Sequence, residues 1–174
     1  LGWEEAQLIN HVIDMVQGGS VFFYYEGVSY QGVLDSLVAL PFFYFLGIST
    51  LALKLSSLSL FALYIWSCFY LANLINREII WVVLMLLLFP PMNVLLTTYY
   101  YASYALICFL GNVIFILFCR LQSSEKPSLT VVFFLFFVMG LSIYTFTYSI
   151  LYISTVFILF VLSQPEWSKV RSIF

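Results

Sequence analysis

The chain has 174 residues, of which 64% are hydrophobic, 21% aromatic and only 8% charged. Soluble domains carry about 25% charged residues, so this composition excludes a water-soluble globular domain and a disordered segment. It also excludes a nucleic-acid-binding domain, because six basic residues and a net charge of −2 form no basic patch. The composition is typical of an integral membrane protein.

The N-terminal region is acidic and is predicted to contain short helices. Residues 1–35 hold five acidic residues and no Lys or Arg, whereas the remainder holds three acidic and six basic residues. Apolar residues recur with helical spacing over residues 5–16, and Gly18-Gly19 ends this predicted helix. Residues 33–49 are apolar but interrupted by an Asp, a Pro and a Gly, which favours a helix lying along the membrane surface.

The rest of the chain is predicted to form five transmembrane helices. A spanning helix needs about 20 apolar residues, and the chain has three runs without charge, at 55–76, 79–119 and 127–164. The two longer runs each divide at a cluster of Tyr and Thr residues, which are typical of the membrane–water interface. The predicted spans lie near residues 54–76, 79–97, 101–120, 127–145 and 148–164.

The basic residues predict which way the bundle is inserted. With five spans, five of the six bases fall on one side, which the positive-inside rule makes cytoplasmic. The fold class is therefore an all-α integral membrane protein, with an extracytoplasmic region over residues 1–53 and a five-span bundle over residues 54–174. We expect it in the cytoplasmic membrane with the C-terminus inside. The cytoplasmic bases are Arg77, Arg120, Lys126, Lys169 and Arg171.

Three residues of the N-terminal half are candidates for chemistry. Glu4 and Glu5 are adjacent, and a partly desolvated carboxylate beside a bilayer can act as a general base toward a hydroxyl. The alternative is a pair of solvated acids at a helix N-terminus, where negative charge is favourable. Lys54 is the base left on the outer side, where its ammonium can bind a phosphate or simply anchor the helix at the interface.

The order of motifs resembles that of GT-C glycosyltransferases, in the branch of protein mannosyltransferases and the lipid A aminoarabinose transferase. The resemblance runs through most of the chain, and it implies that a first family span precedes Leu1. Its N-terminal elements are Trp3-Glu4-Glu5-Ala6, Gly18-Gly19-Ser20-Val21-Phe22-Phe23-Tyr24-Tyr25, Glu26-Gly27-Val28-Ser29-Tyr30-Gln31-Gly32, Leu40-Pro41-Phe42-Phe43-Tyr44-Phe45-Leu46-Gly47 and Thr50-Leu51-Ala52-Leu53-Lys54-Leu55.

This resemblance implies transfer of a sugar from a polyprenyl-phosphate donor to an acceptor outside the cytoplasmic membrane. Glu4 would be the general base, Glu5 would orient the acceptor, and Lys54 would hold the lipid phosphate. Tyr30 and His11 complete the candidate substrate-binding residues. No cofactor is implied. A divalent metal at the two glutamates has no further support in the sequence, and the partners are the lipid-linked donor and membrane lipids.

Two other functions are compatible with the sequence. Glu4 and Lys54 stand where the family usually has Asp and Arg, which suits a non-catalytic scaffold subunit bound to other membrane proteins. A transporter is less favoured, because the predicted spans carry few polar residues at mid-membrane depth. The three cysteines, Cys68, Cys108 and Cys119, lie in apolar runs without metal-ligand spacing and are interpreted as small apolar residues.

Overall fold

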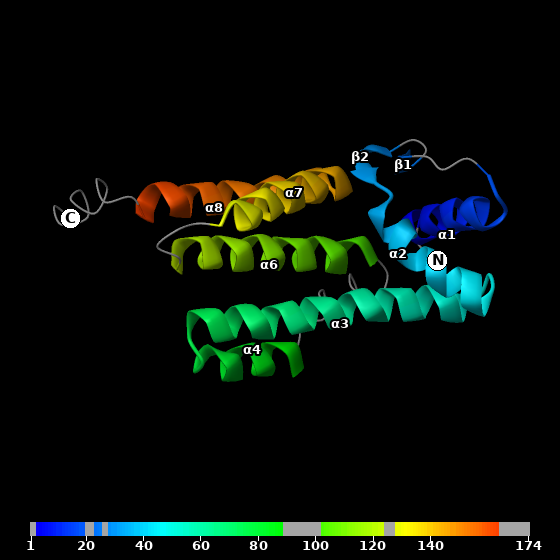
Figure 1. Ribbon diagram of the computed structural model, residues 1–174. Coiled ribbons are helices and arrows are strands. Elements are labelled where there is room, and N and C mark those ends of the chain that lie inside the picture. Colours follow the sequence, from blue (N-terminus) through cyan, green and yellow to red (C-terminus); the bar gives the residue numbers. More distant parts are fainter. Residues whose placement is uncertain (1–2, 20–22, 26–27, 89–101, 124–127, 164–174) are drawn as a thin grey trace.

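The computed structural model describes residues 3–19, 23–25, 28–88, 102–123 and 128–163. It is mostly helical, as the sequence predicts. Four helices, α3 (Thr50–Ile75), α6 (Ala102–Ser123), α7 (Leu129–Thr145) and α8 (Ile150–Ser163), run along the length of the molecule (Figure 1). Helix α6 packs against α3, α7 and α8, and α4 (Ile79–Leu88) folds back against α3.

The N-terminal segment forms a separate layer at one end of this bundle (Figure 1). It consists of α1 (Trp3–Val16), a two-stranded antiparallel hairpin of β1 (Tyr24–Tyr25) and β2 (Val28–Gly32), and α2 (Leu34–Leu46). We call these elements the cap. The two helices lie where the sequence predicts short helices, and the hairpin between them was not predicted.

Glycines end the first helix of the cap. Gly18 has a φ of 78°, and the N–H groups of Gly18 and Gly19 donate to the carbonyls of Met15 and Asp14 at 3.2 and 2.7 Å. This is a Schellman motif, which requires a residue in the left-handed region. A side chain on Gly19 would also come within 2.9 Å of the Asp14 carbonyl oxygen. The pair therefore ends the helix as its sequence predicts.

Two helices in the described part of the chain are long and apolar enough to cross a membrane, Thr50–Ile75 and Tyr104–Ser123, and they indicate membrane association. Helix α3 begins four residues earlier than the predicted span because the Ser49 hydroxyl caps it, accepting from the Ala52 N–H at 3.2 Å. The apolar helices α7 and α8 are shorter. The second half of the predicted span at 79–97 lies outside the described residues.

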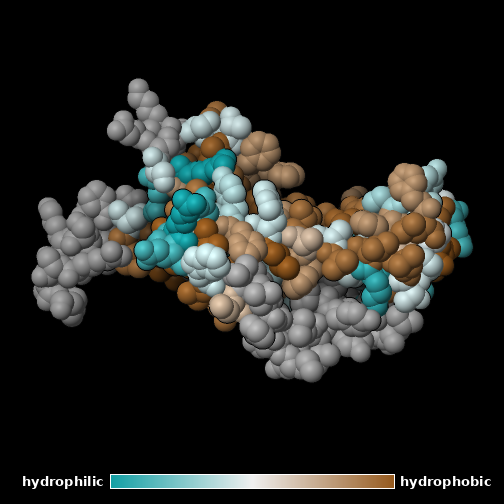
Figure 2. Space-filling model, turned by 90° about the horizontal axis from the view of Figure 1, so that it is seen from below, coloured by the Kyte–Doolittle hydropathy of each residue, from teal (hydrophilic) through white to brown (hydrophobic). Residues whose placement is uncertain are grey.

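The surface of the bundle is apolar to an extent unusual for a soluble protein. Aromatic side chains project from α7, where Phe133 and Phe136 are 63% and 67% exposed, and Trp81 of α4 is 70% exposed. Figure 2 shows the face formed by α3 and α4, with hydrophobic residues along its middle and the most hydrophilic ones gathered toward its two ends. This distribution matches a belt of lipid contacts between two polar ends.

Polar contacts inside the bundle join its helices. The Asn112 side-chain amide on α6 donates to the Ser67 hydroxyl at 2.9 Å and to the Cys68 sulfur at 3.2 Å, both on α3. Between α6 and α8, the Tyr152 hydroxyl donates to the Cys108 sulfur at 3.7 Å. Cys68, Cys108 and Cys119 are all free thiols.

Candidate functional site

The two ends of the bundle differ in charge. Arg77 lies in the turn between α3 and α4, and Arg120 lies in the last turn of α6, so both belong to the end opposite the cap (Figure 1). The Arg120 guanidinium contacts the Tyr70 hydroxyl and lies 5.6 Å from the centre of the Tyr70 ring. The remaining predicted cytoplasmic bases, Lys126, Lys169 and Arg171, lie outside the described residues.

The candidate residues from the sequence are distributed over the cap and the start of α3. Glu4 and Glu5 lie in the first turn of α1, and Tyr30 lies in β2; the side chains of these three are outside what the structure describes. Lys54 lies in the second turn of α3, half-buried, at the cap end of the bundle (Figure 1). The fold therefore brings the helix that carries the two glutamates and the helix that carries Lys54 to the same end.

His11 occupies the interior of the cap. Its side chain is only 7% exposed, and its ring meets the Tyr25 ring edge-on, with the centroids 5.7 Å apart. Burial lowers the pKa of His11, while Asp14 and Asp35 act in the opposite direction to a smaller extent. The imidazole, which α1 directs toward the hairpin, is therefore neutral at pH 7.

A buried polar network continues from His11 into α2. The Tyr25 hydroxyl donates to Asp35 Oδ1 at 2.5 Å and lies 2.5 Å from the Ser36 hydroxyl oxygen. Asp35 Oδ1 also accepts from the Ser36 N–H at 2.9 Å. Asp35 is 2% exposed and Ser36 is fully buried. Burial, and secondarily the Asp35 carboxylate, raise the pKa of Tyr25 far above its ordinary value, so this hydroxyl stays protonated and remains a donor.

This network was not predicted from the sequence. The signal for it was the single acidic residue at the start of an otherwise apolar helix, since a buried carboxylate requires hydrogen-bond donors. The donor could not be identified in advance, because Tyr25 is one of many tyrosines in the chain. The network joins the hairpin to α2, and α1 packs against both.

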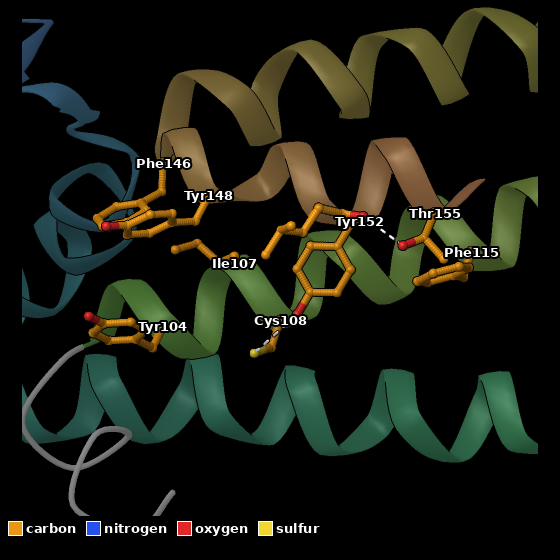
Figure 3. Close-up of a pocket in the computed structure, with 9 residues that line it drawn as sticks. Tyr104, Ile107, Cys108, Phe115, Phe146, Tyr148, Tyr152 and Thr155 are labelled. Atoms are coloured by element: carbon orange, nitrogen blue, oxygen red, sulfur yellow. Dashed lines mark hydrogen bonds between the residues drawn. The ribbon is translucent and has the colours of Figure 1, made fainter. Parts of the chain in front are cut away.

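A cavity of about 430 Å³ lies between α6 and α8, on the side of the bundle (Figure 3). Tyr104, Phe146 and Tyr148 lie toward its cap end, and Phe115 and Thr155 lie at the other end. Tyr152 points across it to Cys108, and its ring meets the Phe115 ring of α6 edge-on, with the centroids 6.3 Å apart. The walls are almost entirely apolar, so the cavity suits a hydrocarbon chain better than a polar reactant.

The described residues contain no group of three or more His, Cys, Asp or Glu side chains that could hold a metal ion. No protein family model, no curated protein and no solved structure matches this chain.

The buried imidazole makes the cap sensitive to acid. Because the pKa of His11 is lowered in the folded state, the unfolded chain takes up a proton below the ordinary value of 6.5 before the folded chain does. We therefore expect the His11 contribution to stability to be constant above about pH 6.5, to fall as the pH drops from 6.5 to the lower folded pKa, and to level off below it. Thermal unfolding in detergent as a function of pH measures this. The substitution His11→Gln should flatten the profile over that interval, and an unchanged profile would contradict the assignment.

Proposed function

We propose that the chain is the membrane-embedded part of a GT-C-like glycosyltransferase, which moves a sugar from a polyprenyl-phosphate donor to an acceptor outside the cytoplasmic membrane. The observation that carries the proposal is the layered arrangement of the cap. Helix α1, with Glu4 and Glu5 in its first turn, and the Lys54 end of α3 share one end of an apolar bundle, opposite Arg77 and Arg120 (Figure 1).

A lipid-linked donor suits this arrangement. Its hydrocarbon tail stays in the lipid beside the bundle, and its phosphate reaches the polar end of a spanning helix, where Lys54 can pair with it. The acceptor arrives from the aqueous side of the cap. The reaction needs no nucleotide-binding domain, because the activated sugar is already attached to the membrane.

The proposed chemistry is a direct displacement. The acceptor oxygen or nitrogen attacks the anomeric carbon of the sugar, and the bond from that carbon to the phosphate oxygen breaks. Glu4 takes the acceptor proton, and Lys54 stabilises the charge that remains on the departing polyprenyl phosphate. Glu5 orients the acceptor. Tyr30 and His11, the latter buried inside the cap, are the remaining proposed substrate-binding residues.

The direct test is sugar transfer by the natural full-length protein in proteoliposomes, supplied with a panel of polyprenyl-phosphate sugars. Release of polyprenyl phosphate, dependent on both protein and acceptor, is the expected result. Absence of release from every donor, together with copurification at fixed stoichiometry with another membrane protein, would favour the scaffold interpretation instead.

A membrane topology follows from the proposal and can be tested separately. Five spans place the cap outside the cell and the α3–α4 turn in the cytoplasm. In a variant without native cysteines, a thiol placed at Tyr148, which is 68% exposed beside the cap, should react with an impermeant reagent in intact cells. A thiol placed at Glu78 in the α3–α4 turn should react after lysis only. Labelling of Glu78→Cys in intact cells would overturn this topology.

A further inference from the structure

Helix α2 of the cap packs against α3 and α6 of the bundle, and the hairpin of the cap meets the bundle at a second place, the end of α7. At the end of α7, the Tyr144 hydroxyl donates to the Phe23 carbonyl oxygen at 2.5 Å and accepts from the Val33 N–H at 3.4 Å. Phe23 immediately precedes β1, and Val33 immediately follows β2. One hydroxyl therefore ties both ends of the hairpin to the bundle, across more than a hundred residues of sequence.

The packing around Tyr144 is close on several sides. A Cβ atom on Gly32 would lie 2.5 Å from the Tyr144 carbonyl oxygen and 2.7 Å from its ring, so only glycine fits there. The Tyr24 ring meets the Tyr144 ring edge-on, with centroids 5.5 Å apart. Gln31 pairs with Phe146, just beyond α7, as an isolated antiparallel β-bridge. We call this set of contacts the Tyr144 clasp.

The clasp acts on the parts of the cap that carry the buried network. Tyr25 lies two residues after Phe23, and Asp35 lies two residues after Val33. The clasp therefore holds both chain segments that are joined by the Tyr25–Asp35 hydrogen bond. The main packing contacts of α1 are with α2 and β1. The position of α1 over the bundle thus depends on α2, which packs against α3 and α6, and on the hairpin, which Tyr144 ties to α7.

We propose that Tyr144 is a positioning residue, which holds the cap, and with it the first turn of α1, in register with the start of α3. Its catalytic consequence rests on the proposed function. Without the hydroxyl, Glu4 on the cap loses its fixed place relative to Lys54 on the bundle. Donor binding through Lys54 then persists, while the rate of transfer falls.

The test compares Tyr144→Phe with Tyr148→Phe, a matched loss of a hydroxyl from an exposed tyrosine in the 3₁₀ helix Thr147–Ser149 that follows α7. Amide hydrogen exchange across residues 28–33 should rise about tenfold in Tyr144→Phe, as expected for the loss of a hydrogen bond that closes a local structure. It should stay at the wild-type rate in Tyr148→Phe. Equal exchange in Tyr144→Phe and wild type would overturn the proposal.

A disulfide that ties the hairpin to the end of α7 should restore slow exchange. A variant that is merely less stable overall would not be rescued in this way. Residues opposite each other in an antiparallel pair have Cα atoms about 4.5–5.5 Å apart, within the range that a disulfide spans. In a background without native cysteines, Gln31→Cys and Phe146→Cys should cross-link and restore slow exchange to Tyr144→Phe, and reduction should reverse this. Failure of the oxidised cross-link to restore slow exchange would overturn the clasp.

The activity measurement separates the two proposals. We expect Tyr144→Phe to lower kcat for transfer about tenfold, with donor affinity unchanged, and the cross-link to restore it. Altered exchange with an unchanged kcat would overturn the positioning role. Wild-type protein without any transfer activity would count against the proposed function alone, because the exchange and rescue results still decide whether Tyr144 holds the cap.

Discussion

Replacing Glu4 by Gln is expected to reduce sugar transfer by about 10²–10⁴-fold, the usual effect of removing a general base. Glutamine keeps the length of the side chain and its ability to hydrogen-bond, but it cannot accept the proton of the acceptor. Expression and donor binding should stay near wild-type levels, because Glu4 is proposed to act on the proton of the acceptor, whereas Lys54 binds the donor phosphate. The measurement is the release of polyprenyl phosphate in proteoliposomes under saturating donor.

Two further variants serve as controls for this result. Lys54→Ala removes the proposed cation for the phosphate, so it should weaken donor binding, whereas Glu4→Gln should not. Glu4→Asp introduces the residue that the resembling family usually carries at this position, and it should keep or raise activity. Full activity of Glu4→Gln would remove Glu4 from the mechanism.

Replacing Tyr25 by Phe is expected to destabilise the cap by about 2–3 kcal/mol, because a buried carboxylate loses a hydrogen-bond donor. The Tyr25 hydroxyl contacts both Asp35 and Ser36 at 2.5 Å, and both partners are almost completely buried. The phenyl ring still fills the same space, so the loss reports the polar contacts and not a cavity. The effect is measured as a lower unfolding temperature in detergent, or as faster hydrogen exchange in the cap.

Tyr24→Phe is the matched control, since Tyr24 is the neighbouring tyrosine in β1 and is 48% exposed. Its loss of a hydroxyl should leave stability within about 0.5 kcal/mol of wild type, as is usual for surface positions. A double variant, Tyr25→Phe with Asp35→Asn, should lose less than the sum of the two single changes, because a neutral amide is less costly to bury than a carboxylate. Equal losses in Tyr24→Phe and Tyr25→Phe would contradict the network.

The sequence by itself determined most of the helices. Charge-free apolar runs can satisfy their backbone groups only as helices in an apolar medium, so α3 and α6 are where composition predicts them. Local chemistry also determined where some helices end. Gly18-Gly19 ends α1, and the polar Tyr and Thr cluster near 144–149 separates α7 from α8. These features depend on neighbouring residues, and neighbours are visible in a sequence.

Only the tertiary structure decided how the cap is built and where it is attached. The hairpin at residues 24–32 has no distinctive alternation and depends on partners far along the chain. Tyr25 hydrogen-bonds Asp35, and Tyr144 hydrogen-bonds Phe23 and Val33. These residues meet because α2 and α7 pack at the same end of the bundle. The sequence marked Glu4, His11 and Lys54 as chemically interesting. It did not reveal that His11 is buried beside Tyr25, because desolvation depends on what the fold places around a side chain.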